Sequence, residues 1–214
     1  MKAYLLKEYY QNRFGHILYV IVCVIVMLAG IFTGNSAGAV YSPILTISCL
    51  MVSMFAMTVF TNDERDRSRV MMALTPVKPR SLVNCRYLKA VAFPTVMIAL
   101  NVIAVFTGLA LGGWSISGHG IQLLFSAALS FAAAVIPTAI LYPLYFRFSA
   151  EKVGIIQGIV AFLAISVIMP LILAQEAFDT PEGSFVCIGL LAGSAVLLLL
   201  SYLASLDLCQ RRDL

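Results

Sequence analysis

The charged residues of this 214-residue chain are confined to five short segments, and the stretches between them carry none. The segments are 1–13, 63–89, 147–152, 176–182 and 207–214, and the uncharged stretches between them are 49, 57, 23 and 24 residues long. Only 11% of residues are charged, against about 25% in soluble domains. About 20 apolar residues suffice to span a bilayer. The chain is therefore expected to be an integral membrane protein, which excludes a soluble enzyme and a disordered chain.

The uncharged stretches are long enough for six membrane spans. The two shorter ones hold one span each, and clusters rich in Gly, Ser and Asn near 34–43 and 112–120 divide each longer one into two. The expected spans lie near 17–33, 42–61, 90–111, 121–146, 153–174 and 184–205. The sequence thus predicts an all-α fold in which residues 1–214 form a single transmembrane domain.

The basic residues predict the orientation of these spans, because Lys and Arg stay on the cytoplasmic side of short loops. With an inside N-terminus, all 14 Lys and Arg lie inside, and the outer loops carry only Glu176, Asp179 and Glu182. We therefore expect a protein of the cell (plasma) membrane with both termini in the cytoplasm. Cys85 and Cys209 should then react with thiol reagents from the cytoplasmic side only. The net charge of +4 follows from this distribution and predicts no nucleic-acid partner.

The first 14 residues are expected to form a helix on the membrane surface. At helical spacing Leu5, Leu6 and Tyr9 share one face, while polar side chains occupy the other. An unstructured basic leader is one alternative. A cleaved signal peptide is another, since Ala37-Gly38-Ala39 resembles a small-residue cleavage site.

The spans carry few groups that could perform chemistry. The five cysteines are scattered singly and the two histidines are expected on opposite faces of the membrane, so no metal site is predicted. Ion-driven transporters and intramembrane enzymes need ionisable groups within the bilayer, and the spans have none. Their most polar residues, Asn101, Gln122 and Gln157, are expected to form hydrogen bonds between helices.

An internal ATPase is also excluded by the sequence. A phosphate-binding P-loop requires Gly-Lys before its Ser or Thr, and no Gly-Lys dipeptide occurs in the chain. The longest segment outside the expected spans, 63–89, has 27 residues, far fewer than the roughly 100–200 of a typical domain. Transport, if this chain performs it, must draw its energy from a separate protein.

Segment 63–89 is the best candidate for contact with such a protein. Asp63 and Arg67 are spaced to form an ion pair on a short helix, and Met71 and Leu74 contribute to an apolar patch on it. Pro76 and Pro79 should end that helix before a second one begins. The residues expected to contact an ATPase are Asp63, Glu64, Arg65, Arg67, Arg69, Met71, Leu74, Pro76 and Arg80. The alternative is a solvated hairpin that only obeys the charge rule.

Two motifs carry a resemblance to a known family. The first consists of Phe60, Asp63, Glu64, Pro76, Val77, Arg80, Leu82, Val83, Arg86, Tyr87 and Leu88, and the second is the run 143–152, Pro-Leu-Tyr-Phe-Arg-Phe-Ser-Ala-Glu-Lys. With the Met-Lys start and the six-span layout, the chain resembles the ABC-type-2 permeases. It is most similar to the short six-span kind that includes exporters of phenol-soluble modulins and bacteriocin-like peptides.

The resemblance implies a permease subunit that forms a homo- or heterodimer and binds two P-loop ATPase subunits. ATP and Mg would be bound in those partners, with no cofactor and no catalytic residue in this chain. The segment around Asp63–Arg80 would act as the coupling helix, and Arg147, Glu151 and Lys152 would form a second cytoplasmic contact.

Three glycine pairs at four-residue spacing suit close helix approach and hence dimerisation: Gly108 with Gly112, Gly154 with Gly158, and Gly189 with Gly193. At least two of these pairs are expected to pack within one subunit instead.

The expected cargo is a hydrophobic or amphipathic peptide, because spans without fixed charge offer little to replace the hydration of an ion or a sugar. Lipid or a hydrophobic drug is the competing cargo. The outer acids Glu176, Asp179 and Glu182 would hold cationic molecules, or would only satisfy the charge rule. The rival function is a non-transporting scaffold or immunity protein that sequesters a peptide or partner.

Overall fold

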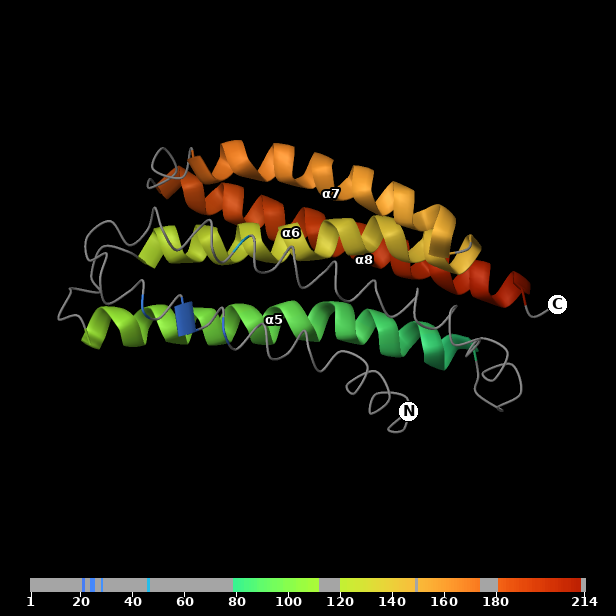
Figure 1. Cartoon of the computed structure of the whole chain (residues 1–214), viewed down its shortest axis with the longest axis horizontal. Helices are drawn as coiled ribbons and strands as arrows, with labels where there is room; N and C mark the ends of the chain where they lie inside the picture. The colour runs from blue at the N-terminus through green and yellow to red at the C-terminus, as the bar shows by residue number, and fades with distance from the viewer. Residues whose placement is uncertain are drawn as a thin grey trace.

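Four long antiparallel helices make up most of the described structure. The computed structural model describes residues 79–111, 120–148, 150–173 and 181–212, together with the single residues 21, 24, 25, 28 and 46. Its helices are α5 (Pro79–Leu111), α6 (Gly120–Arg147), α7 (Ala150–Leu173) and α8 (Pro181–Arg212), which run in alternating directions (Figure 1). These residues include no strand, so the all-α prediction is confirmed for them. Apart from those single residues, the expected spans 17–33 and 42–61 lie outside the described residues, as do the surface helix and the coupling segment before Pro79.

All four helices are long and apolar enough to cross a membrane. Their candidate spans are Val83–Leu111, Leu123–Arg147, Lys152–Ile172 and Phe185–Gln210, which match the last four expected spans closely at all but two ends. The chain is therefore a multi-pass membrane protein.

The helix expected after Pro79 and the span expected near 90–111 are one continuous helix. We expected the span to begin near residue 90 because residues 80–89 include three basic residues, but α5 continues through all of them. The long stems of Arg80 and Lys89 can carry their charge to the water boundary, whereas Arg86 is only 5% exposed. With 33 residues, α5 is about 50 Å long and exceeds the roughly 30 Å hydrocarbon core. The segment that precedes α5 is thus joined to the membrane span without a flexible break.

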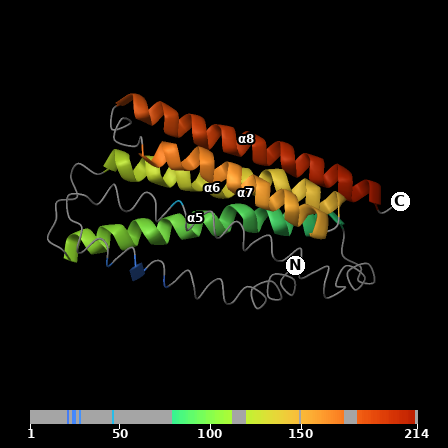
Figure 2. The same ribbon diagram turned by 45° about the horizontal axis from the view of Figure 1, so that its top comes forward.

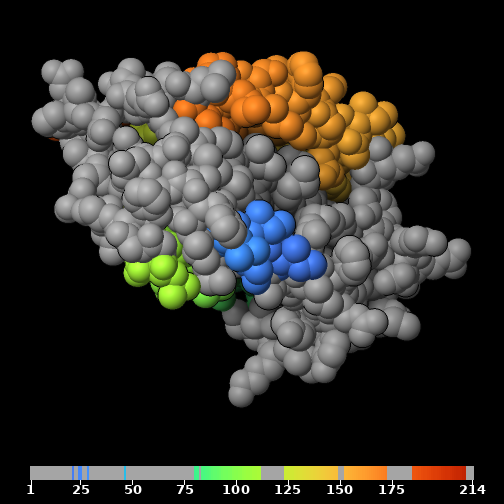
Figure 3. All heavy atoms as spheres, turned by 60° about the vertical axis from the view of Figure 1, so that its left-hand side comes forward, coloured from blue at the N-terminus to red at the C-terminus, as the bar shows by residue number. Residues whose placement is uncertain are grey.

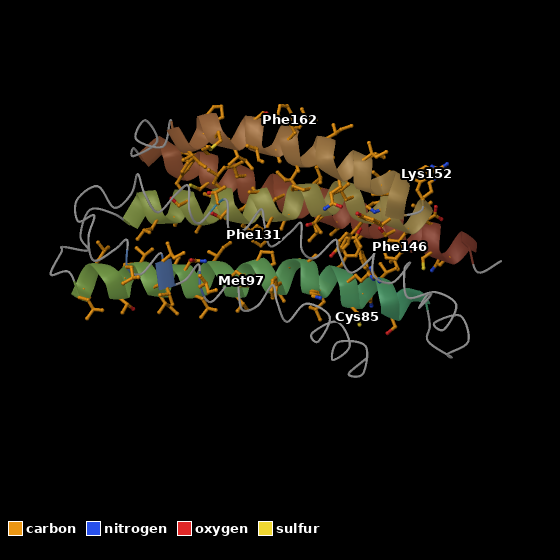
Figure 4. The ribbon with its side chains drawn as sticks, viewed as in Figure 1. Cys85, Met97, Phe131, Phe146, Lys152 and Phe162 are labelled. Atoms are coloured by element: carbon orange, nitrogen blue, oxygen red, sulfur yellow. The ribbon has the colours of Figure 1, made fainter. Side chains whose placement is uncertain are left out.

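One end of the bundle collects the basic residues. Among the described helices, all Lys and Arg belong to the first turns of α5 and α7 or the last turns of α6 and α8: Arg80, Arg86, Lys89, Arg147, Lys152, Arg211 and Arg212. We call this the basic end. It lies at the right of Figures 1 and 4, where Cys85, Phe146 and Lys152 are labelled. The predicted gathering of the basic residues at one end of the spans is therefore seen in the described helices.

Helix α6 is the centre of the described bundle and contacts each of the other three helices. Its most extensive contact is with α8. Small residues are buried at this contact: Ala128 and Ala133 of α6 share one apolar cluster with Cys187 of α8, and Ser201 of α8 bonds to Ala139 of α6. Cys187, Ser194 and Ser201 are all buried and are seven residues apart, so they fall on one face of α8. Small side chains allow helix backbones to approach closely, which is how helices associate in a bilayer.

Helices α7 and α8 expose large apolar surfaces. Ile155 and Phe162 on α7 are 72% and 71% exposed, and Phe185 on α8 is 73% exposed. Figure 4 shows Phe162 pointing away from the other helices, and α7 lies along the surface in the space-filling view of Figure 3. In a membrane, such faces are covered by lipid or by another transmembrane helix.

Two of the glycine pairs lie on these exposed faces. No atom of the described structure comes within 4 Å of a Cβ placed at Gly154, Gly158, Gly189 or Gly193. The expectation that at least two pairs pack within one subunit is therefore wrong for these two pairs, as far as the described residues extend. In the third pair Gly108 is buried, and Gly112 lies outside the described residues.

The structure changes which cysteines can report the orientation. Cys85 is only 2% exposed, so slow labelling of its thiol would not tell on which side of the membrane it lies. Arg80 and Lys152 are exposed and are better positions for a reporter cysteine. In a cysteine-free background, R80C and K152C should react in intact cells only with membrane-permeant maleimides. A cysteine introduced at Ser115 or Thr180 should react with impermeant ones, and this pair is the matched control. Rapid impermeant labelling of K152C would contradict the orientation.

Candidate functional site at the basic end

Tyrosine side chains from three helices meet at the basic end. The ring of Tyr87 on α5 lies edge-on to Tyr142 of α6, with centroids 5.2 Å apart, and to Tyr202 of α8, 5.3 Å apart. Edge-to-face pairs add about 0.5–1.5 kcal/mol to the gain from burial alone. Around them, all four helices contribute to one apolar cluster, whose buried members are Val83, Tyr87, Ala90, Leu141, Tyr142, Tyr145 and Val153. Tyr87 is the α5 residue at the centre of this contact.

The Tyr87 hydroxyl joins α5 to α8 through two serines one turn apart. Its oxygen lies 2.6 Å from Ser201 Oγ and 2.8 Å from Ser205 Oγ. Ser201 in turn donates its proton to the carbonyl of Ala139 on α6, at 2.6 Å. Each hydroxyl has a single proton, so Tyr87 must donate to Ser201 and accept from Ser205. The result is a directed chain of three hydrogen bonds, Ser205 to Tyr87 to Ser201 to Ala139, which connects α8, α5 and α6.

The last acceptor in this chain exists because of a proline. The carbonyl of Ala139 would normally accept the backbone N–H four residues on, but that residue is Pro143, which has none. Lipid cannot donate a hydrogen bond, so a carbonyl freed in this way must be satisfied by a neighbouring group. Ser201 supplies the donor. Pro143 therefore fixes the position of Ser201 on α8, and Ser201 in turn fixes the hydroxyl of Tyr87.

Two further hydrogen bonds hold the same end together. The Tyr202 hydroxyl of α8 donates to Asn84 Oδ1 of α5 at 2.7 Å, on the exposed side of the cluster. The Tyr145 hydroxyl of α6 donates to Gln157 Oε1 of α7, also at 2.7 Å. We call Tyr87, Tyr142, Tyr145 and Tyr202, with their partners Asn84, Gln157, Ser201 and Ser205, the tyrosine joint.

The sequence-predicted contact residues are only partly described. Arg80 lies in the first turn of α5 and is exposed, and Arg147 and Lys152 are exposed at the same end of the bundle. The Arg147 guanidinium stacks over the ring of Phe148 at 5.4 Å. Glu151 is placed in α7 by its backbone alone. The residues Asp63, Glu64, Arg65, Arg67, Arg69, Met71, Leu74 and Pro76 lie outside the described residues, as do Glu176 and Asp179, and of Glu182 only the helical backbone is described.

The expectation for the polar residues of the spans is confirmed for Gln157, which forms a bond between helices, as just described. Asn101, fully buried on α5, donates to the Met97 carbonyl of its own helix at 3.0 Å. The side chain of Gln122 lies outside the described residues.

Sequence reasoning missed the serines and most of the tyrosines of the joint. The signal was present in two places. Ser194, Ser201 and Ser205 share one face of α8. Pro143 has no N–H, which indicates that the carbonyl of Ala139, four residues before it, lacks its usual helical donor. Neither pattern says which helix faces the serines, so the pairing with Tyr87 required the structure. Among the described residues, no group of three His, Cys, Asp or Glu could hold a metal ion.

Replacing Ser201 should cost more stability than replacing Ser205. S201A leaves the Ala139 carbonyl buried without its donor, a loss of about 1–3 kcal/mol, whereas S205A removes a single hydroxyl bond, worth about 0.6 kcal/mol between membrane helices. The free energy of unfolding, measured by SDS titration in mixed micelles, should show this order. The matched control is S166A, because Ser166 is exposed and bonds only within α7. Equal effects of S201A and S166A would contradict this account of the carbonyl.

Comparison with known proteins now gives the family. The chain matches the model of the ABC-2 family transporter proteins over residues 5–210, which includes α5, α6, α7 and all but the last two residues of α8. No curated protein and no solved structure matches it. The match spans nearly the whole chain and agrees with the apolar helices and the motifs that carried the resemblance. The chain therefore belongs to the ABC-2 family of transporter proteins.

Proposed function

We propose that this protein is the membrane-spanning permease subunit of an ATP-driven exporter, which moves hydrophobic or amphipathic peptides out of the cell. The family match over residues 5–210 is the observation that carries the proposal. It is supported by the absence of charged residues from the middle of the described spans. Without ionisable groups the spans cannot use an ion gradient in the way that proton and sodium transporters do.

The energy comes from a separate P-loop ATPase, which binds ATP and Mg and performs the hydrolysis, so this chain is not itself an enzyme. Its docking surface is the segment Asp63–Arg80, with Arg147, Glu151 and Lys152 as a second contact. Two described features support this assignment. Arg80, Arg147 and Lys152 are exposed at the same end of the bundle, and α5 continues without interruption from Pro79 into the membrane.

A second copy of this chain, or a related permease, completes the transporter. The exposed glycine pairs on α7 and α8 support this, because open space above Gly154, Gly158, Gly189 and Gly193 would let another helix approach closely. The assembly lies in the plasma membrane with its basic end in the cytoplasm.

An ATPase should co-purify with the chain after mild extraction. Reversing two charges of the docking segment, in E64K with R69E, should weaken its binding at least about tenfold, which corresponds to about 1.4 kcal/mol. The measurement is the amount of ATPase retained on the tagged permease in lipid nanodiscs. The matched control reverses two acids of the opposite end, in E176K with E182K, and should leave the ATPase bound. A preparation that retains no ATPase would favour the scaffold or immunity function instead.

Amphipathic peptides should change the ATPase activity of the reconstituted complex well below the concentration at which they lyse vesicles. Neutralising Glu176, Asp179 and Glu182 to amides should weaken the response to cationic peptides only, because fixed negative charge concentrates cations near it. E182Q alone is a necessary control, since Glu182 lies in the first turn of α8, where a negative charge stabilises the helix. Equal responses to cationic and anionic peptides in all variants would remove the electrostatic part of the proposal. A response to lipids or hydrophobic drugs alone would change the cargo.

A further inference from the structure

The described helices are held together differently at their two ends. At the basic end, the apolar cluster includes residues of α5, α6, α7 and α8. Towards the opposite end, a second cluster of buried residues includes Phe125 and Leu129 of α6, Ile168 and Ile172 of α7, and Cys187 of α8, but no residue of α5. Of these two clusters, α5 therefore belongs only to the one at the basic end, although Asn101, Val105 and Leu109 in its outer half are also fully buried.

The course of the helices agrees with this difference. Figures 1 and 2 both show α5 and α8 far apart at the end opposite the basic end and converging towards the basic end. Hydrogen bonds join α5 to α8 where the two helices converge: Tyr87 with Ser201 and Ser205, and Tyr202 with Asn84. Directional bonds thus fix the two helices at one level along their length.

We propose that Tyr87 is the pivot on which α5 turns against α8, and so is the positioning residue that converts movement of the ATPase-docking segment into movement of the outer part of the transporter. This inference rests on the proposed function for the source of the movement. The position of Tyr87 along α5 is what makes it effective. Tyr87 lies eight residues from Pro79, where the docking segment ends, and 24 residues from Leu111. At 1.5 Å per residue these arms are about 12 Å and 36 Å long, so a small displacement at Pro79 becomes one about three times larger at Leu111.

The hydroxyl of Tyr87 is suited to this role because it is bonded on both sides. It donates to Ser201, which is itself held by the Ala139 carbonyl, and it accepts from Ser205. A ring alone could slide over α8, since apolar contact has no fixed direction. Two hydrogen bonds with defined geometry allow rotation about the contact but oppose sliding.

A bend at Pro94 is the competing source of such movement. Pro94 lies inside α5 and removes one backbone hydrogen bond seven residues beyond Tyr87. If α5 bends there, its outer part moves whether or not Tyr87 is bonded. The two mechanisms therefore differ in their response to loss of the hydroxyl.

The test measures distances between α5 and α8 by pulsed electron paramagnetic resonance, with spin labels in a cysteine-free background of the full chain in nanodiscs. Pairs are diluted with unlabelled protein so that only distances within one chain contribute. The near pair is L88C with L203C and the far pair is L111C with F185C, all at exposed positions. Y87F removes the hydroxyl and keeps the ring, and S201A with S205A removes its partners. Y145F is the matched control, because the bond of Tyr145 joins α6 to α7 instead.

Without nucleotide, the near pair should give a distribution no more than half as wide as that of the far pair. Y87F and the double serine variant should each widen the near distribution about twofold, while Y145F leaves it unchanged. Near and far distributions of equal width in the unmodified protein, or no effect of either set of variants, would overturn the pivot. These measurements without nucleotide need no ATPase, so they distinguish failure of the pivot from failure of the proposed function.

With the co-purified ATPase, ATP and vanadate should shift the far pair at least threefold more than the near pair. Y87F should reduce the far shift by at least half with the ATPase still bound, whereas P94A should leave the far shift intact. Loss of the far shift in P94A together with its retention in Y87F would assign the movement to the proline and overturn the proposal. A chain that retains no ATPase would fail as a permease subunit, and the pivot would lose its source of movement.

Discussion

The structure depends on a requirement imposed by the bilayer, which is that each backbone carbonyl in a membrane helix must find a donor within the protein. Pro143 leaves the carbonyl of Ala139 without its usual N–H, in the most buried of the four helices. Ser201 satisfies it, and the remaining lone pairs of Ser201 then accept the hydroxyl of Tyr87. The backbone N–H that Pro143 lacks thus explains why Ser201 of α8 faces the Ala139 carbonyl and why Tyr87 of α5 bonds to that serine. The tyrosine rings pack around a hydrogen-bond chain whose starting point is the proline.

Away from this joint, many contacts between the described helices have no fixed direction. Small buried residues, among them Ala128 and Ala133 of α6 and Cys187 of α8, lie together in one apolar cluster. Ser194 donates to the carbonyl of Leu191 in its own helix, and Thr138 donates to that of Ala134. Ser130 donates to the carbonyl of Ser126 and also lies 3.2 Å from the hydroxyl of Thr46, so it forms a bond outside α6. Hydroxyls that bond only within their own helix, such as those of Ser194 and Thr138, do not fix the height of a neighbouring helix.

The sequence predicted the described spans well because the bilayer leaves a strong signal, namely long stretches without charge between clusters of charge. It placed the start of the α5 span too late because charge was taken as the limit of the span, whereas Arg86 and Lys89 lie on the same helix, which begins at Pro79. Hydrogen bonding between helices was predicted from the amide side chains and is seen at Gln157, which accepts from Tyr145. The tyrosine joint could not be predicted in full. The carbonyl freed by Pro143 and the row of serines on one face of α8 can each be recognised in the local sequence. Which helices are neighbours depends on packing over the whole bundle.

The contrast between directional and non-directional contacts limits how these helices can move relative to one another. A displacement that preserves the hydrogen bonds of Tyr87 must keep α5 and α8 at the same level at the basic end. A displacement of α8 along α6 would break the bond from Ser201 to the Ala139 carbonyl, whereas α5 is absent from the cluster formed by α6, α7 and α8 towards the opposite end. The least costly rearrangement of the described helices is therefore a change of angle between α5 and the other three, centred near the basic end. Such a change would alter the separation of α5 and α8 at the end where they diverge (Figures 1 and 2), while the end bearing Arg80, Arg147 and Lys152 keeps its geometry.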